Sequence, residues 1–227
     1  MRRDPFAALA PTYESWYETP LGAHADAEEL AALRRLLAGE SMGLVAEIGA
    51  GTGHVTRALA ADCGRIVAVE PSPAMRAEGV RRSSGLRIDW VAGAGERLPF
   101  REGVFEGALI VAVLEFVADP AAVLAEAFRV VRPGGWVVVG WLDARSSWTA
   151  LYRTEADRGA EPWAGARFFT LEALVELAGS APEAVEYALW AGPFAEPPFV
   201  EAEEAGRRAG HPPAFGAARW RSGRGRR

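Results

Sequence analysis

The chain has 227 residues, of which half are hydrophobic and 24% are charged, and its formal net charge is −5. This length and composition are typical of one globular α/β domain with appendages, and the negative charge disfavours a protein that coats nucleic acid. We expect neither a signal peptide nor a membrane span, because no apolar run is long enough for either. The single cysteine, Cys63, excludes an internal disulfide and fits a reducing cytoplasm.

The first predicted elements are helices between residues 5 and 38, with a break near residue 20. Leucines recur at helical spacing in residues 24–38, which predicts a helix with one face on a sheet. Tyr13, Trp16 and Tyr17 come before this helix. Two interpretations stay open: these aromatics cover a ligand as a lid, or they dock a terminal helix.

The most informative segment is VAEIGAGTGHVT at residues 45–56, which predicts a buried strand, a glycine-rich turn and a helix start. Gly49, Gly51 and Gly53 permit a sharp turn and the close approach of a ligand. Glu47 ends the strand at the same place. Because a buried charge is costly unless it is paired, we expect its carboxylate to meet a cationic group or backbone donors.

The spacing of these glycines separates several kinds of site. The dinucleotide fingerprint G-x-G-x-x-G has its third glycine where this chain has His54, which disfavours an NAD-dependent oxidoreductase. A P-loop is excluded, because the chain contains no lysine. A glycine-rich turn in an ordinary α/β protein remains the alternative without a ligand.

A second strand, RIVAVE at 65–70, ends in Glu70. An acid about 20 residues after a glycine turn is placed to bind the two hydroxyls of a ribose. Ser72 and Pro73 then predict the start of a helix. Met75 lies one turn into this helix, where it packs against either an adenine or the sheet.

The rest of the chain continues this alternation. Strands are predicted at 86–92, 107–112 and 136–141, and Asp119 is predicted to cap a helix that Pro120 begins. The pattern predicts an α/β fold: a Rossmann-like, doubly wound, mainly parallel sheet of about seven strands with helices on both faces. Later elements are expected as helices at 148–157 and 170–178, strands at 185–190 and 214–220, a proline- and acid-rich loop at 193–213, and a basic tail at 221–227.

We expect this single domain to have three parts. Residues 1–40 form an N-terminal helical cap, and residues 41–143 form a cofactor-binding core. Residues 144–227 complete the sheet and cover the substrate. Aromatics on both sides of the core, among them Trp148, Tyr152, Trp163, Phe168 and Phe169, predict an apolar cap over the carboxyl ends of the strands.

Four segments together resemble the class I S-adenosylmethionine-dependent methyltransferases, in the type 11 methyltransferase-domain group, which includes the ubiquinone and menaquinone C-methyltransferases. They are EIGAGTG, the acid in VAVEPSPAM, AGAGERLPF and FRVVRPGGWVVV, and the resemblance covers about residues 43–142. It implies a cytoplasmic enzyme that transfers a methyl group from S-adenosylmethionine to a small molecule, with no nucleic-acid partner, and leaves a homodimer open. The alternative is a protein that binds S-adenosylmethionine without catalysis.

Carried over by position, the resemblance implies a set of residues around the cofactor. They are Glu47, Gly49, Ala50, Gly51 and Gly53 at the first strand and turn, Glu70 at the ribose, Pro71 and Met75 beside the adenine, Gly95 and Glu96 at its edge, Ile110 and Val111 beneath it, and Tyr13 and Tyr17 from the N-terminal aromatics. Relatives usually carry an aspartate where this chain has Ala94. The adenine amino group therefore loses an acceptor unless Glu96 or water replaces it.

For methyl transfer the protein mainly has to align the acceptor with the methyl group and exclude water. These two effects can lower the barrier by roughly 7–11 kcal/mol. A general base is needed only if the acceptor must lose a proton, and then adds about 10²–10⁴-fold. Glu115 and His54 are the candidate acid–base residues, and the catalytic residues are otherwise unassigned. The sequence shows no cluster of metal ligands.

Overall fold

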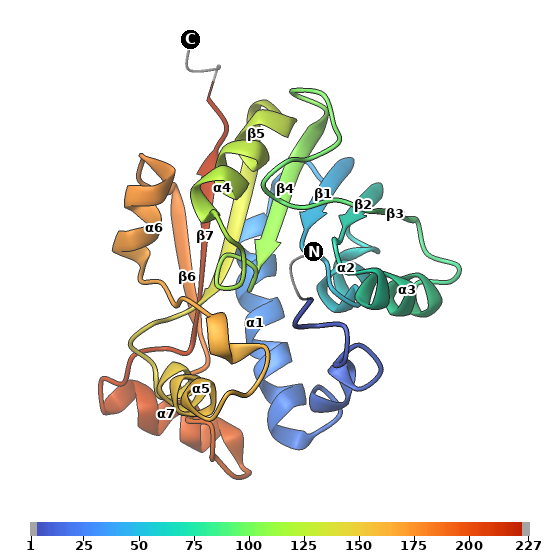
Figure 1. Cartoon of the computed structure of the whole chain (residues 1–227). Helices are drawn as coiled ribbons and strands as arrows, with labels where there is room; N and C mark the ends of the chain where they lie inside the picture. Colours follow the sequence, from blue (N-terminus) through green and yellow to red (C-terminus); the bar gives the residue numbers. More distant parts are fainter. Residues whose placement is uncertain (1–3, 224–227) are drawn as a thin grey trace.

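A seven-stranded sheet in the order β3-β2-β1-β4-β5-β7-β6 forms the centre of the computed structural model, which describes residues 4–223 (Figure 1). The strands are β1 (Leu44–Ile48), β2 (Arg65–Val69), β3 (Ile88–Val91), β4 (Phe105–Val111), β5 (Val131–Leu142), β6 (Ala184–Ala188) and β7 (Phe215–Arg221). Strands β1 to β5 pair in parallel, and β7 lies antiparallel between β5 and β6. The predicted doubly wound, mainly parallel sheet is confirmed.

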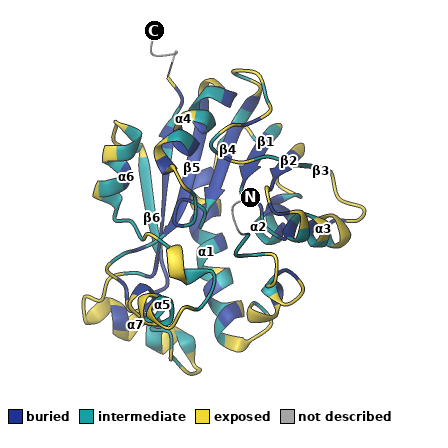
Figure 2. Ribbon diagram, viewed as in Figure 1, coloured by how far each residue is buried: buried dark blue, intermediate teal, exposed yellow. Residues whose placement is uncertain are grey.

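Helices cover both faces of this sheet. They are α1 (Pro20–Leu37), α2 (His54–Leu59), α3 (Pro73–Arg82), α4 (Pro120–Val130), α5 (Ser147–Asp157), α6 (Leu171–Ala178) and α7 (Phe199–Arg208), with short 3-10 helices η1 (Tyr13–Trp16) and η2 (Trp163–Gly165). Helices α4 and α6 pack on one face, and α1 and α2 pack on the other. The central strands are therefore buried on both sides (Figure 2), which explains their almost continuous apolar sequences.

Polar side chains mark the beginnings of these helices. The side chain of Ser72 accepts a hydrogen bond from the Met75 amide at 3.3 Å, and that of Asp119 accepts one from the Ala122 amide at 3.0 Å. Both predicted caps are confirmed. Thr19 caps α1 in the same way, so the break predicted near residue 20 is the start of the helix, and the preceding residues 5–12 form turns instead of a helix.

The segment 193–213 was predicted to be a loop, and this prediction is wrong, because it contains α7. The carboxylate of Glu203 holds this helix in place. It accepts hydrogen bonds from the amides of Trp190 and Ala191 at 2.8 and 3.2 Å and pairs with His24 of α1 at 3.1 Å. Arg207 lies over the Trp190 ring, 3.7 Å from its centroid.

Two further features bear on a membrane or a nucleic acid as a partner: the length of the helices and the basic residues from 221 onward. No helix within residues 4–223 is both long and apolar enough to cross a membrane. The basic tail begins in β7, where Arg221 pairs with Glu40 and Glu183, and its residues 224–227 lie outside the described part of the chain.

Candidate functional site

A cavity of about 590 Å³ lies at the carboxyl ends of the parallel strands. Its walls come from the segments that follow β1, β2, β3 and β4, at residues 49–52, 70–73, 94–96 and 111–113. The N-terminal segment, residues 4–18, and α1 supply the opposite side. This edge of a doubly wound sheet is where such folds bind their ligands.

Glycine is required at the three positions of the turn for different structural reasons. All three have positive φ angles, of 75° at Gly49, 58° at Gly51 and 77° at Gly53. A Cβ atom at Gly49 would lie 2.6 Å from the Val113 side chain, and one at Gly53 would lie 2.7 Å from the Trp90 ring. Only at Gly51 is there space, since the nearest atom to its Cβ position is Met75 Cε at 3.5 Å.

Glu70 is joined directly to this turn. One carboxylate oxygen accepts a hydrogen bond from the Gly51 amide at 2.8 Å, and the other accepts one from the Ser72 amide at 2.7 Å. The amides of Gly49 and Ala50 donate to the Val69 carbonyl. Because these amides are already bonded to protein acceptors, they do not form the anion cradle of a pyrophosphate site, which disfavours a dinucleotide ligand.

Burial raises the pKa of Glu70, and the amides of Ser72 and Gly51 oppose this shift because they stabilise the ionised form. Each of its oxygens can accept a further hydrogen bond. Glu70 therefore offers acceptors to a ligand in the cavity while it holds the turn.

Glu47 lies beneath the turn with only 4% of its surface exposed, and it lines the cavity. Its carboxylate accepts a short hydrogen bond from the Thr56 hydroxyl, so the expected cationic or backbone partner is replaced by a hydroxyl. Burial raises the pKa of Glu47 to about 7, although the Thr56 hydrogen bond favours the ionised form.

Most of the other residues expected around a cofactor also line the cavity: Ala50, Pro71, Met75, Gly95, Glu96, Val111, Tyr13 and Tyr17. Gly53 and Ile110 do not. The Gly53 side-chain position is filled by Trp90, and Ile110 is fully buried in the core. Glu96 accepts a hydrogen bond from the Ala118 amide at 3.2 Å, and Ala94 lines the cavity where relatives carry an aspartate.

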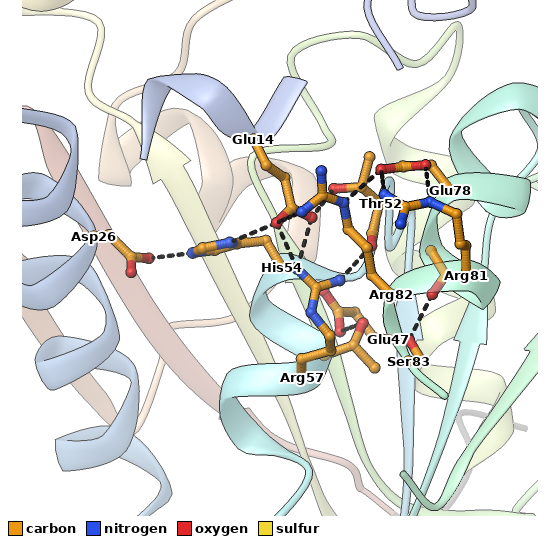
Figure 3. Close-up of polar contacts among 12 residues, drawn as sticks. Glu14, Asp26, Glu47, Thr52, His54, Arg57, Glu78, Arg81, Arg82 and Ser83 are labelled. Carbon is orange, nitrogen blue, oxygen red and sulfur yellow. Dashed lines mark hydrogen bonds and ion pairs between the residues drawn. The ribbon is translucent and has the colours of Figure 1, made fainter. Parts of the chain in front are cut away.

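An ionic cluster ties the N-terminal segment to α2 and α3 (Figure 3). Glu14, only 7% exposed, accepts hydrogen bonds at 2.6 Å from Arg57 to both oxygens and at 2.7 Å from the Thr52 hydroxyl. Arg82 of α3 lies 3.3 Å away. Burial alone would raise the pKa of Glu14, but the bonds from Arg57 and Thr52 hold it below its usual value.

His54 belongs to the same cluster. Its Nε2 lies 2.8 Å from Asp26 of α1, its Nδ1 lies 3.7 Å from Glu14, and its ring stacks on Tyr17 with centroids 3.8 Å apart (Figure 3). Both ring nitrogens face acids and one ring face is covered. The arrangement makes His54 a bridge between α1, η1 and α2 at the wall of the cavity.

The structure does not bring Glu115 to the cavity. This residue is fully buried, and its Oε1 accepts a hydrogen bond from the Leu142 amide at 2.8 Å, while Oε2 has no partner within residues 4–223. Burial raises its pKa to about 7. Its carboxylate binds the backbone at the end of β5. The position of Glu115 therefore does not support its candidacy as an acid–base residue of this cavity.

The aromatic residues form three sets. Tyr13 and Tyr17 line the cavity. Tyr152 stacks on Trp163 with centroids 3.9 Å apart, and Phe168 adds to this stack, but none of the three lines the cavity. Trp16 meets Trp148 edge to face at 6.1 Å and so joins the N-terminal segment to α5.

Glu29 is the site residue that the sequence did not single out. It lines the cavity from α1, where it is half-buried, and has no hydrogen-bond or ion-pair partner among the described residues. Burial, together with the charge of Asp26, raises its pKa to about 8. Glu29 lies one turn before Leu33, so it is an acid within the apolar stripe of the helix. This unusual position could have identified it from the sequence. Within residues 4–223 no His, Cys, Asp and Glu side chains are grouped to hold a metal ion.

Comparison with known proteins identifies relatives of the core. Residues 46–139 match the family model described as a methyltransferase domain. An uncharacterized protein of Mycobacterium tuberculosis is 34% identical over 168 residues, which are 74% of this chain and 56% of that protein. The demethylmenaquinone methyltransferase of Beutenbergia cavernae is 42% identical over 95 residues, which are 42% of this chain and 39% of that enzyme. The chain thus spans about half the length, or less, of these relatives.

Among solved structures, one similar fold is that of a protein from Thermotoga maritima. It is described as an S-adenosylmethionine-dependent methyltransferase, a possible histamine N-methyltransferase. The TM-score is 0.76 at 27% identity, and the match covers 96% of this chain and 98% of that chain.

Proposed function

Residues 46–139 form a class I, S-adenosylmethionine-dependent methyltransferase domain, and from this premise we propose that the chain methylates a small molecule bound in the cavity. The observation that carries the proposal is one cavity with two unlike walls. The glycine turn and Glu70 form the first wall, and the aromatic N-terminal segment and α1 form the second. Its volume of about 590 Å³ lies within the range of small-molecule sites.

The residues at the first wall fit S-adenosylmethionine. Gly51 leaves space where a side chain would stand, and Glu70 offers acceptors to ribose hydroxyls. The buried Asp4 Oδ2, which has no partner, adds negative charge near Glu70 for a cationic ligand. When bound, the cofactor supplies an electrophilic methyl group on a cationic sulfonium, whose carbon–sulfur bond breaks with its electron pair going to sulfur.

The side chains have distinct tasks in this proposal. Pro71 and Met75 hold the adenine, and Glu96 stands in for the acceptor that Ala94 lacks. Glu47 and the glycine turn hold the amino acid end. The chain's own contribution to the rate is to orient the acceptor and exclude water.

The division of the chain follows from the same proposal. We assign the cofactor to residues 41–143, which contain the matched domain, and the acceptor to the N-terminal cap at 1–40; no described residue of 144–227, which complete the sheet, lines the cavity. The similarity to demethylmenaquinone methyltransferase falls within 95 residues and supports the domain without identifying the acceptor. Because the N-terminal segment lies over the cavity, a small molecule fits better than a polynucleotide or a folded protein.

Calorimetric titration of S-adenosylmethionine tests this function. Glu70→Ala removes charged hydrogen bonds worth roughly 1.5–3 kcal/mol, so the Kd is expected to rise about tenfold or more. Glu102→Ala, an exposed acid outside the cavity, is the control and is expected to leave the Kd unchanged.

Transfer of a tritiated methyl group to small-molecule, protein and RNA fractions of a cell extract then identifies the acceptor class. Equal affinity of the parent and Glu70→Ala for the cofactor would contradict the ribose assignment. Label found only in protein or RNA would contradict the small-molecule acceptor, and binding without any transfer would favour a non-catalytic protein.

A further inference from the structure

The charge of the cavity is strongly one-sided. The acids that line it are Asp4, Asp26, Glu29, Glu47, Glu70 and Glu96. Within the described residues, its lining contains no arginine, and His54 is its one basic side chain. This absence is notable in a chain whose 25 basic residues are all arginine. Such a cavity repels an anionic acceptor and attracts a cation.

All of these acids except Glu29 have a protein partner. Asp26 pairs with His54, Glu47 accepts from Thr56, Glu70 accepts from the turn, Glu96 accepts from Ala118, and Asp4 accepts from the Phe6 amide. Arg57 and Arg82 are both bonded to Glu14, and Arg76 donates to the backbone carbonyl of Glu70 at 2.8 Å. Glu29 is left without a hydrogen-bond or ion-pair partner in residues 4–223.

Glu29 lines the cavity from α1, which supplies none of the residues assigned to the cofactor. It projects from α1 together with Leu30 and Leu33. Tyr13 lines the same cavity, and the charges of both Glu29 and Glu70 act on its hydroxyl, whose pKa is raised mainly by burial. Tyr17 also lies within range of the Glu29 charge. An unpaired carboxylate beside aromatic rings is the combination that binds an ammonium group in proteins.

We propose that the methyl acceptor is a small primary or secondary amine, whose ammonium group is bound by Glu29 beside the rings of Tyr13 and Tyr17. This inference rests on the proposed function and names the substrate class of the same cavity. Leu30 and Leu33 give the amine an apolar wall.

The same contact supplies the chemistry that an amine needs. An ammonium nitrogen has no lone pair, so one N–H proton must leave before the nitrogen can act as a nucleophile. The Glu29 carboxylate takes this proton. The freed lone pair forms the new nitrogen–carbon bond while the carbon–sulfur bond breaks toward sulfur, and the product nitrogen carries the positive charge. Burial holds the pKa of Glu29 at about 8, which suits proton transfer near neutral pH.

Three probes of similar shape test the inference: phenethylamine, 2-phenylethanol and 3-phenylpropionate, which end in an ammonium, a hydroxyl and a carboxylate. Their binding to the full chain saturated with S-adenosylhomocysteine is measured by calorimetry at pH 8. We expect phenethylamine to bind about tenfold more tightly than the alcohol, as a charged hydrogen bond implies, and the carboxylate to bind most weakly.

Two variants separate the role of Glu29 from general effects on the helix. Glu29→Gln is expected to abolish the preference for the amine and to leave the affinity for S-adenosylmethionine within about twofold, a change that is small on the free-energy scale. Glu28→Gln, the same change at the neighbouring acid outside the cavity, is expected to keep the preference.

An equal or absent preference among the three probes, or a preference that survives in Glu29→Gln, would overturn the inference. Failure of the parent to bind S-adenosylmethionine would instead overturn the proposed function and this inference with it. The cofactor titration and the probe titration therefore distinguish the two failures.

Discussion

Replacing Glu14 by glutamine tests whether the ionic cluster holds the N-terminal segment over the cavity. The substitution keeps the shape of the side chain but removes the charge that Arg57 contacts with both oxygens and that Arg82 approaches. Breaking a buried ion pair costs about 3–5 kcal/mol, but the side chains of Arg57 and Arg82 are 18% and 28% exposed and regain some water. We therefore expect a loss of about 2–3 kcal/mol.

Urea unfolding at pH 7 measures this loss, and hydrogen exchange of residues 8–20 localises it. The expected loss corresponds to a fall in Tm of roughly 4–12 °C for a chain of this size. Because the folded state lowers the pKa of Glu14, its stabilisation is present above the usual carboxylate pKa and disappears as the pH falls through the folded-state pKa. The parent and the variant should thus converge in acid.

The control is Glu18→Gln, which changes an exposed acid of the same segment and should alter the free energy of unfolding by less than about 0.5 kcal/mol. A Glu14→Gln variant with the stability of this control, and with unchanged exchange in residues 8–20, would refute the reasoning that the cluster fastens the segment.

Two further predictions concern the ligands. Gly51→Val should weaken S-adenosylmethionine binding far more than Gly85→Val, since both glycines have positive φ but only Gly51 lines the cavity; equal effects in calorimetry would count against the cavity as the cofactor site. Phenethylamine, which keeps its proton in this range, should bind roughly eightfold more tightly at pH 8.5 than at pH 7, because the ionised fraction of Glu29 rises through its pKa of about 8. Asp26 also faces Glu29, while Tyr13, Tyr17 and Tyr152 have raised pKa values and stay neutral. Glu47, with a pKa of about 7, also ionises in this range, so Glu29→Gln should reduce the rise to about twofold.

Local patterns were sufficient to predict the elements of the core. The strand before the glycine turn, the acid after β2 and the caps Ser72 and Asp119 each follow from residues close in sequence. The backbone geometry of these features depends on neighbours in the sequence. A continuous apolar strand is typical of the centre of a parallel sheet, so few other positions in the fold are possible for it. Most residues expected around the cofactor line the cavity for the same reason, although their contacts with a ligand stay predictions.

The features that the sequence did not reveal all depend on partners distant in the chain. Glu14 is buried because Arg57 and Arg82 reach it from two later helices. Glu203 similarly stabilises α7 within a segment whose prolines and acids favour a loop. Glu115 follows β4 as expected, but its carboxylate bonds to the end of β5. These bonding partners are determined by tertiary packing, which cannot be seen in a single sequence.

The position of β7 has a consequence for how the chain can be assembled during synthesis. β7 follows β6 in the sequence, yet it lies between β5 and β6, and β6 pairs with no other strand in the described part of the chain. On the ribosome, β5 must therefore wait with one edge open until residues 215–221 have emerged. An open apolar edge invites pairing with other nascent chains. The antiparallel strand β7 closes that edge, and β6 can join the sheet only after it.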